Sequence, residues 1–150
     1  VAELRHLLAD HPPKALREMI AAAFGALFLT GGVGRPVPFA SVWIGGAARL
    51  NGPPAERAAA RLAALDLSLP DGFAEPPDHL GVLLLIAAEL GEAERAAFLR
   101  AELWPWLADF TALCQPGGRV VYPAAARALT AFVEADLSRI AVGAAPFTSR

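Results

Sequence analysis

The sequence has very little cysteine and lysine: Cys114 and Lys14 are the only residue of each kind among 150. A single cysteine cannot form an intramolecular disulfide, and it excludes a metal site built from several thiolates. We therefore expect a reducing, cytoplasmic compartment. The other basic residues are arginines that form no basic run, and the formal net charge is −2. This balance argues against nucleic acid as a partner.

Long hydrophobic stretches are also absent. The longest apolar runs, Met19 to Leu29 and Leu80 to Ala88, are shorter than the roughly 18 residues that indicate a membrane span. The first ten residues include Glu3, Arg5 and Asp10, which is unlike a signal peptide. We expect no stable insertion into a membrane.

The residues that are present predict a folded, helical protein. Hydrophobic residues make up 55% of the chain and charged residues 19%, which argues against disorder. Apolar residues recur at helical spacing, and no segment is a clear strand, although Phe39 to Ile44 has a strand-like composition. The expected helices are a short stretch around Leu4 to Leu8, then Lys14 to Leu29, Ala55 to Leu65, Pro77 to Leu90, Glu92 to Glu102, a helix restarted near Pro105 that runs to Cys114, and a last one from Arg119 or Tyr122 to Ile140. The sequence thus predicts an all-α, single-domain helical bundle of about six helices over residues 1–150.

The most distinctive segment is Glu75-Pro76-Pro77-Asp78-His79, which opens the nearly all-apolar helix predicted from Pro77 to Leu90. Asp78 and His79 have several interpretations: an acid/base pair, metal ligands, or polar anchors for a partner. A structural role is also open, because an Asp in a first helical turn satisfies free N–H groups and complements the helix dipole. The same dipole favours the neutral form of His79.

Other candidate sites have weak signatures. His6 and His11 lie in the weakly patterned N-terminal stretch, and no spacing matches a known metal motif. Ser41 and Cys114 have no nucleophile signature around them, and the glycines from Gly31 to Gly34 lack the Lys-Ser/Thr ending of a phosphate loop. We therefore predict no catalytic residue, no metal site and no cofactor.

The three tryptophans divide into two groups. Trp43 lies in a loop-like segment between glycines and prolines, where an amphipathic aromatic ring can line a pocket for an apolar peptide. Trp104 and Trp106 flank Pro105, and we expect them to pack around the helix kink that this proline causes.

Four segments, taken in order, resemble one protein family. They are Phe28-Leu29-Thr30-Gly31, Pro36-Val37-Pro38-Phe39-Ala40-Ser41-Val42-Trp43, Glu75-Pro76-Pro77-Asp78-His79-Leu80, and Leu103-Trp104-Pro105-Trp106 followed by Phe110. Together they resemble the TorD/DmsD family of cytoplasmic molybdoenzyme chaperones, and most closely its DmsD-like branch. The resemblance covers roughly Ala23 to Ile140, and its specific part is the Glu-x-Pro-x-Asp-His motif before an apolar helix.

The resemblance implies an all-helical protein that is not an enzyme. Such a chaperone binds the twin-arginine leader peptide of an apo-molybdoenzyme, of the dimethyl sulfoxide or trimethylamine N-oxide reductase type, and delays export until the cofactor is inserted. The peptide-binding residues that it implies are Ser41, Val42, Trp43, Pro76, Asp78 and His79, with Glu75 beside them. Carboxylates of Glu75 and Asp78 would suit the guanidinium groups of the peptide, and Trp43 with the start of the central helix would suit its apolar part.

The chain departs from the family pattern in two places. Ile44 is followed by Gly45, where the DmsD-like branch commonly has an acidic residue. The stretch before Phe24 is also short for the family, which leaves open a bundle completed by a second copy in a homodimer.

Three alternatives remain open at this point. The first is a nitrate-reductase-type assembly chaperone, which binds the N-terminal peptide of a non-exported subunit. The second is a helical enzyme or nucleotide hydrolase that uses Asp78 and His79. The third is a helical interaction module in which Asp78 is only a helix cap.

Overall fold

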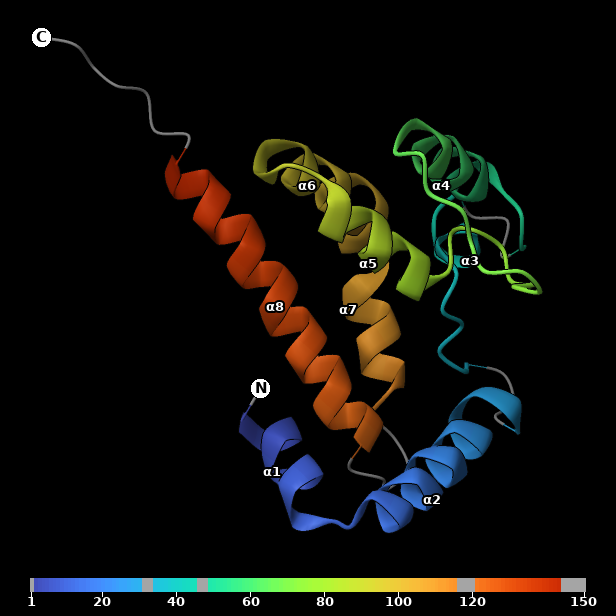
Figure 1. Cartoon of the computed structure of the whole chain (residues 1–150), viewed down its shortest axis with the longest axis vertical. Coiled ribbons are helices and arrows are strands. Elements are labelled where there is room, and N and C mark those ends of the chain that lie inside the picture. The colour runs from blue at the N-terminus through green and yellow to red at the C-terminus, as the bar shows by residue number, and fades with distance from the viewer. Residues whose placement is uncertain (1, 31–33, 46–48, 116–120, 144–150) are drawn as a thin grey trace, which may run out of the picture. The chain divides into compact units, whose positions relative to one another are not determined.

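The computed structural model describes residues 2–30, 34–45, 49–115 and 121–143, without the side chains of residues 140–143. These residues form helices, and no β-strand occurs in the four ranges (Figure 1). The all-α prediction is confirmed. In chain order the elements are α1 (Ala2–Asp10), α2 (Pro13–Phe24), the π-helical turn η1 (Gly25–Leu29), α3 (Ala40–Trp43), α4 (Pro53–Ala64), α5 (Leu80–Glu89), α6 (Glu92–Phe98), the π-helical turn η2 (Leu99–Leu103), α7 (Trp104–Leu113) and α8 (Val121–Gly143).

The chain divides into two compact units. Unit 1 comprises Val1–Val37 and Leu107–Glu134, and unit 2 comprises Pro38–Trp106 and Ala135–Arg150. The division therefore falls inside α7 and inside α8, so each of these helices contributes residues to both units.

In unit 1, residues from both ends of the chain are joined by specific contacts. Arg127 on α8 donates two hydrogen bonds to the carboxylate of Glu3 on α1, at 3.1 and 2.6 Å. The rings of Phe28 and Tyr122 meet edge to face, with centroids 5.2 Å apart. The buried apolar residues of this unit are Ala23, Leu107, Phe110, Cys114, Ala124, Ala126 and Val133.

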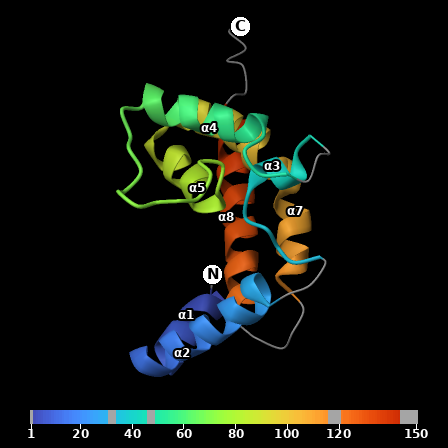
Figure 2. The same ribbon diagram turned by 90° about the vertical axis from the view of Figure 1, so that its right-hand side faces the viewer.

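In unit 2, α4 packs against both α3 and α5 (Figure 2). The turn η2 also packs against α5. Helix α4 begins with Pro53 in its first turn, where the missing proline N–H has no cost because the first N–H groups of a helix lack intrahelical partners. Apolar side chains from these elements form the core, and those least exposed are Ala40, Ala58, Leu83, Ile86, Leu99 and Leu103.

A buried ion-pair network joins α6 to the last part of α8. The carboxylate of Asp136, 2% exposed, is bound by Arg95 at 2.7 Å and by Arg139 at 2.7 Å. The pKa of Asp136 lies below its usual value, mainly because its carboxylate accepts a hydrogen bond from Arg95. A carboxylate this buried requires such partners.

Helix α5 differs from its prediction in where it begins. It starts at Leu80 and not at Pro77, and His79, with φ −60° and ψ 138°, is its N-cap. A proline disfavours the helical conformation in the residue before it, so Pro77 opposes a helical Pro76. A turn then follows, in which the His79 N–H donates to the Pro76 carbonyl at 3.1 Å.

The prediction that the helix would kink or restart at Pro105 is confirmed. The turn η2 lies just before it, and the Trp104 N–H donates to the carbonyl of Leu99, five residues back. A proline in a regular helix would clash with the carbonyl four residues earlier, and a wider π-helical turn relieves such crowding. The last helix also runs beyond its expected end at Ile140, to Gly143.

No helix in the described part of the chain combines the length and the apolar character needed to cross a membrane.

Candidate functional site

The two segments singled out in the sequence meet in unit 2. Phe39 and His79 form an isolated antiparallel β-bridge. The Leu80 N–H donates to the Pro38 carbonyl at 2.8 Å, and the Ala40 N–H donates to the Asp78 carbonyl at 3.2 Å. We call this contact of residues 38–41 with residues 78–80 the junction. Its strand-like geometry is local, because Phe39 (φ −122°, ψ 125°) and His79 (φ −60°, ψ 138°) are both extended and each is the N-cap of the helix that follows it.

Asp78 is the centre of the junction. The residue is 0% exposed, and its Oδ2 accepts a hydrogen bond from the Ser41 N–H at 2.6 Å. Asp78 thus caps α3, which is distant in sequence, and not the helix that follows it. Its Oδ1 has no hydrogen-bond partner among the described residues. In this conformation the carboxylate is out of reach of an external arginine, so its direct role is to hold the two segments together.

His79 caps α5 and lies among aromatic rings. Its Nδ1 accepts the Gly81 N–H at 3.1 Å, which requires that nitrogen to be unprotonated. Burial lowers the pKa of the imidazole, against the opposing charges of Glu75 and Asp78. The predicted neutral form is therefore favoured, and burial is the main cause. Its ring meets Phe39 edge to face at 5.3 Å and Phe73 at 6.4 Å.

Trp43 ends α3 and lies against a second tryptophan. Its ring is nearly parallel to that of Trp106, at 14°, with centroids 6.2 Å apart. Trp106 is itself fixed, because its Nε1–H donates to the carbonyl of Glu102 at 2.7 Å. The Glu102 carboxylate in turn accepts two hydrogen bonds from Arg57 on α4, at 2.6 and 2.8 Å. Trp43, which is partly exposed, therefore stacks on a tryptophan whose indole is fixed by a hydrogen bond.

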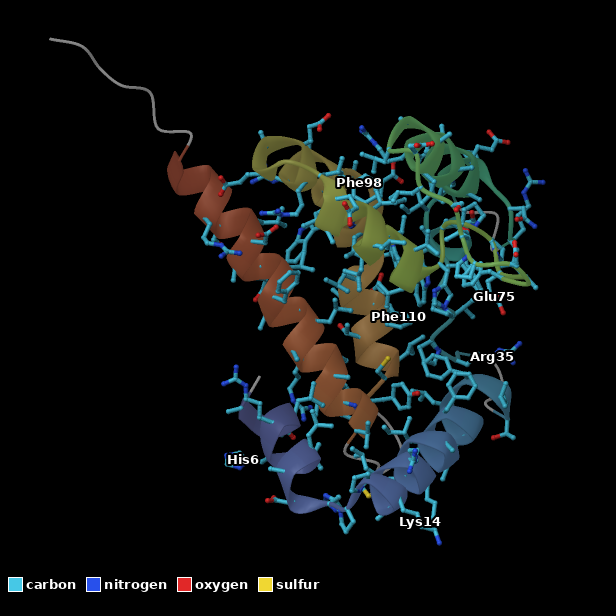
Figure 3. All side chains as sticks on the ribbon, viewed as in Figure 1. His6, Lys14, Arg35, Glu75, Phe98 and Phe110 are labelled. Carbon is cyan, nitrogen blue, oxygen red and sulfur yellow. The ribbon has the colours of Figure 1, made fainter. Side chains whose placement is uncertain are left out.

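The other predicted site residues lie around the junction. Ser41 is buried, and its hydroxyl accepts the Gly52 N–H at 3.0 Å, which ties α3 to the start of α4. Val42 and Pro76 are partly exposed, and Glu75 is exposed. Figure 3 shows Glu75 in the loop that leads to α5. The structure thus joins Ser41 directly to Asp78, while Trp43 contacts Trp106 and His79 contacts Phe39.

Sequence reasoning did not identify Phe39, Phe73 and Trp106 as neighbours of these residues. Their signals are weak. Phe39 follows a proline and Trp106 lies on a helix, where an aromatic residue usually belongs to the core, and Phe73 lies in a loop with no motif around it. Gly52, which donates to Ser41, follows Asn51, a non-glycine residue with φ 57°. An Asn-Gly pair indicates a tight turn, and in the structure this turn brings the Gly52 N–H to the hydroxyl of Ser41.

The remaining candidates show no additional chemistry. No three His, Cys, Asp or Glu side chains gather as a metal site within the described ranges. Burial raises the pKa of the Cys114 thiol to about 11, so it is protonated and a poor nucleophile at neutral pH. Of the glycine stretch, Gly31, Gly32 and the Val33 that follows them lie outside the described residues.

The lowered pKa of His79 predicts a pH-dependent stability. Between the folded pKa and the unfolded value of about 6.5, the unfolded chain binds more protons, so the free energy of unfolding falls as the pH drops through this window. His79→Asn keeps a side-chain acceptor for the Gly81 N–H and does not titrate. Chemical denaturation from neutral pH to about pH 5 should show a weaker loss of stability in this variant than in the parent. His6→Asn, at an exposed position, is the control, and equal slopes for all three proteins would contradict the prediction.

Comparison with known proteins identifies relatives of the chain. The model of the nitrate reductase delta subunit family matches residues 1–112. A protein named chaperone protein TorD from Psychrobacter sp. (strain PRwf-1) is 36% identical over an alignment of 141 residues, and the match covers 83% of this chain and 62% of that protein. Chaperone protein TorD from Shewanella pealeana is 34% identical over an alignment of 148 residues, and the match covers 91% of this chain and 65% of the relative.

A third relative, chaperone protein TorD from Shewanella piezotolerans, is 32% identical over an alignment of 149 residues, and the match covers 91% of this chain and 67% of the relative. The chain thus spans about two thirds of the length of these relatives. No solved structure matches it at a significant level. On the family model and these relatives together, the chain belongs to the TorD/DmsD-like family of chaperones.

Proposed function

We propose that the protein is an assembly chaperone for a molybdoenzyme and binds the twin-arginine leader peptide of the apo-enzyme. The client is of the dimethyl sulfoxide or trimethylamine N-oxide reductase type, and binding delays its export until cofactor insertion. The chain acts in the cytoplasm as a single chaperone domain without a catalytic reaction or cofactor of its own. Its mechanism is a higher affinity for the immature precursor than for the matured enzyme.

The observation that carries the proposal is the junction. Ser41 to Trp43 and Glu75 to His79 are far apart in the sequence, and the hydrogen bond between Ser41 and Asp78 joins them in one place. These are the two segments that the family resemblance implies as the peptide-binding region. Family membership supports the chaperone role, and relatives named chaperone protein TorD support it further.

In this proposal each site residue has a separate task. Asp78 and Ser41 hold the two segments together, because both are buried. Glu75, which is exposed and has no ion-pair partner among the described residues, accepts a guanidinium group of the peptide. Trp43 and Val42 from one segment, with Pro76 and His79 from the other, present partly exposed apolar and aromatic surface to the peptide.

Titration with a synthetic peptide tests the proposal. The peptide carries two arginines followed by an apolar stretch, and a second version carries lysines in their place. Lysine cannot make the two-pronged contact of arginine with a carboxylate, so we expect about ten-fold weaker binding of the lysine version. Trp43→Ala should lose about as much affinity for the arginine peptide, whereas Trp104→Ala, at a 42% exposed position outside the site, should bind as the parent does.

The result also separates the alternatives. Equal binding of the arginine and lysine peptides would favour the nitrate-reductase-type chaperone, whose client needs no functional twin-arginine motif. Absence of binding to either peptide would contradict the proposed function. Light scattering of the same samples determines whether the chain acts as a homodimer.

A further inference from the structure

One face of α5 is apolar and exposed. The helix buries Val82, Leu83, Ile86 and Ala87, but Leu85 is 41% exposed, and Gly81 and Ala88 are exposed as well. These three positions are spaced by four and three residues, so they lie on the same side of the helix. A helix that is hydrophobic all round is normally buried on every side, and in this one the side of Gly81, Leu85 and Ala88 is exposed.

This face continues beyond the start of the helix. Gly81 is next to the ring of His79, since a Cβ atom built on Gly81 would lie 3.3 Å from His79 Nδ1. The His79 ring in turn meets that of Phe73, which is 38% exposed. We call this surface of Phe73, His79, Gly81, Leu85 and Ala88 the apolar strip. The helix that carries most of it, α5, spans ten residues, or about 15 Å.

An acidic residue lies on each side of the helical part of the apolar strip. Glu75 lies in the loop that leads to α5 (Figure 3), between Phe73 and His79 in the chain, and Glu89 ends the helix beside Ala88. Neither carboxylate forms an ion pair within the described part of the chain. At the Glu75 end, the rings of Phe73 and His79 also offer faces on which a guanidinium group can stack. The charge pattern is complementary to an apolar segment that begins with arginines.

We propose that the apolar strip is the docking surface for the apolar part of the client peptide, whose arginines lie at the Glu75 end. This inference rests on the proposed function and adds a surface to it, because Leu85, Ala88 and Phe73 are not among the residues that the family resemblance implies. The apolar part packs along α5 from Gly81 towards Ala88. Leu85, in the middle, is the main apolar contact.

A double-mutant cycle tests the contact with Leu85. Leu85→Gln is compared with the parent on two peptides that share the arginines, one with the apolar stretch and one with a polar stretch of the same length. We expect Leu85→Gln to weaken binding of the apolar peptide about three- to ten-fold and binding of the polar peptide less than about two-fold. Phe132→Gln is the matched control, because Phe132 is 54% exposed on α8 and outside the strip.

The charged ends provide a second comparison. Glu75→Gln should weaken binding of the arginine peptide about five- to ten-fold, whereas Glu89→Gln should change it less than about two-fold. A larger effect of Glu89→Gln would overturn the proposed direction of the peptide.

A fluorescent label reports directly on the surface. Cys114 is 3% exposed and its pKa is raised to about 11, so a thiol introduced at the surface is the one that reacts. An environment-sensitive dye on Ala88→Cys should shift its emission to the blue when the arginine peptide binds. The same dye on Ala63→Cys, at an exposed position of α4, should not respond.

The outcomes are distinguishable from a failure of the proposed function. If the parent binds the arginine peptide and Leu85→Gln binds it equally well, the strip is not the docking surface, although the proposed function stands. If the parent binds neither peptide, both proposals fall. If Leu85→Gln instead changes the molecular mass in solution, the strip is covered by a second copy of the chain, and the inference is likewise overturned.

Discussion

Replacing Asp78 by alanine is expected to abolish most peptide binding, with a loss of at least about ten-fold, while the far-UV circular dichroism keeps its helical form. The substitution removes the acceptor of the Ser41 N–H, which lies 2.6 Å from Asp78 Oδ2. A buried donor left without a partner costs about 1–3 kcal/mol. We expect this loss to destabilise the junction, which positions Ser41 to Trp43. The longer helices do not depend on this hydrogen bond, so the helical circular dichroism signal should persist.

Asp78→Asn is the matched variant, because its amide oxygen still accepts the Ser41 N–H. If Asp78 acts by holding the junction, Asp78→Asn should bind the arginine peptide within about three-fold of the parent. Isothermal titration measures the affinities, and chemical denaturation measures the free energy of unfolding. A stable Asp78→Asn protein that has lost binding would show that the peptide uses the charge directly, and the junction would then have to open to expose it.

Replacing Trp106 by alanine is expected to have the largest effect on stability. Trp106 is 1% exposed, and its removal leaves a cavity and the Glu102 carbonyl without its indole donor. Truncation of a buried tryptophan costs about 3–5 kcal/mol. Trp43 also loses the ring on which it rests, so binding of the arginine peptide should weaken even where the variant remains folded.

The neighbouring tryptophan is the natural control. Trp104 is two residues away and 42% exposed, so Trp104→Ala should change the free energy of unfolding by less than about 1 kcal/mol. Denaturant unfolding of the two variants and the parent, followed by circular dichroism, gives both differences. Similar losses for Trp104→Ala and Trp106→Ala would mean that the indole of Trp106 is not the packed centre that its burial indicates.

The helices were predictable because their signals are local. Prolines and glycines mark most of the helix ends, and the restart at Pro105 follows from the missing N–H of that one residue. The predicted start of α5 at Pro77 was wrong by three residues, since the helix begins at Leu80. A proline pair allows a helix to begin but does not require it. A turn from Pro76 to His79 precedes the helix, and Asp78 and Leu80 are hydrogen-bonded to the distant segment at Pro38 and Ala40, which has no local signal in the sequence.

The site was predictable only in part. The sequence singled out Asp78, His79 and Trp43 by residue type and by family resemblance. It did not reveal that Asp78 is inaccessible and caps α3, since Ser41 is 37 residues away along the chain. Trp106 was assigned to a kink, and its contact with Trp43 had no local signal.

By itself the sequence determined that the chain is all-helical, where most of its helices lie, and to which family it belongs, because helical periodicity and short motifs are properties of neighbouring residues. The tertiary structure alone decided which groups meet at the junction and which side of α5 faces outward. Helix α5 is apolar on every side, so its own pattern cannot distinguish one face from another. Packing of α4 and η2 against the helix covers one side and leaves Leu85 exposed on the other.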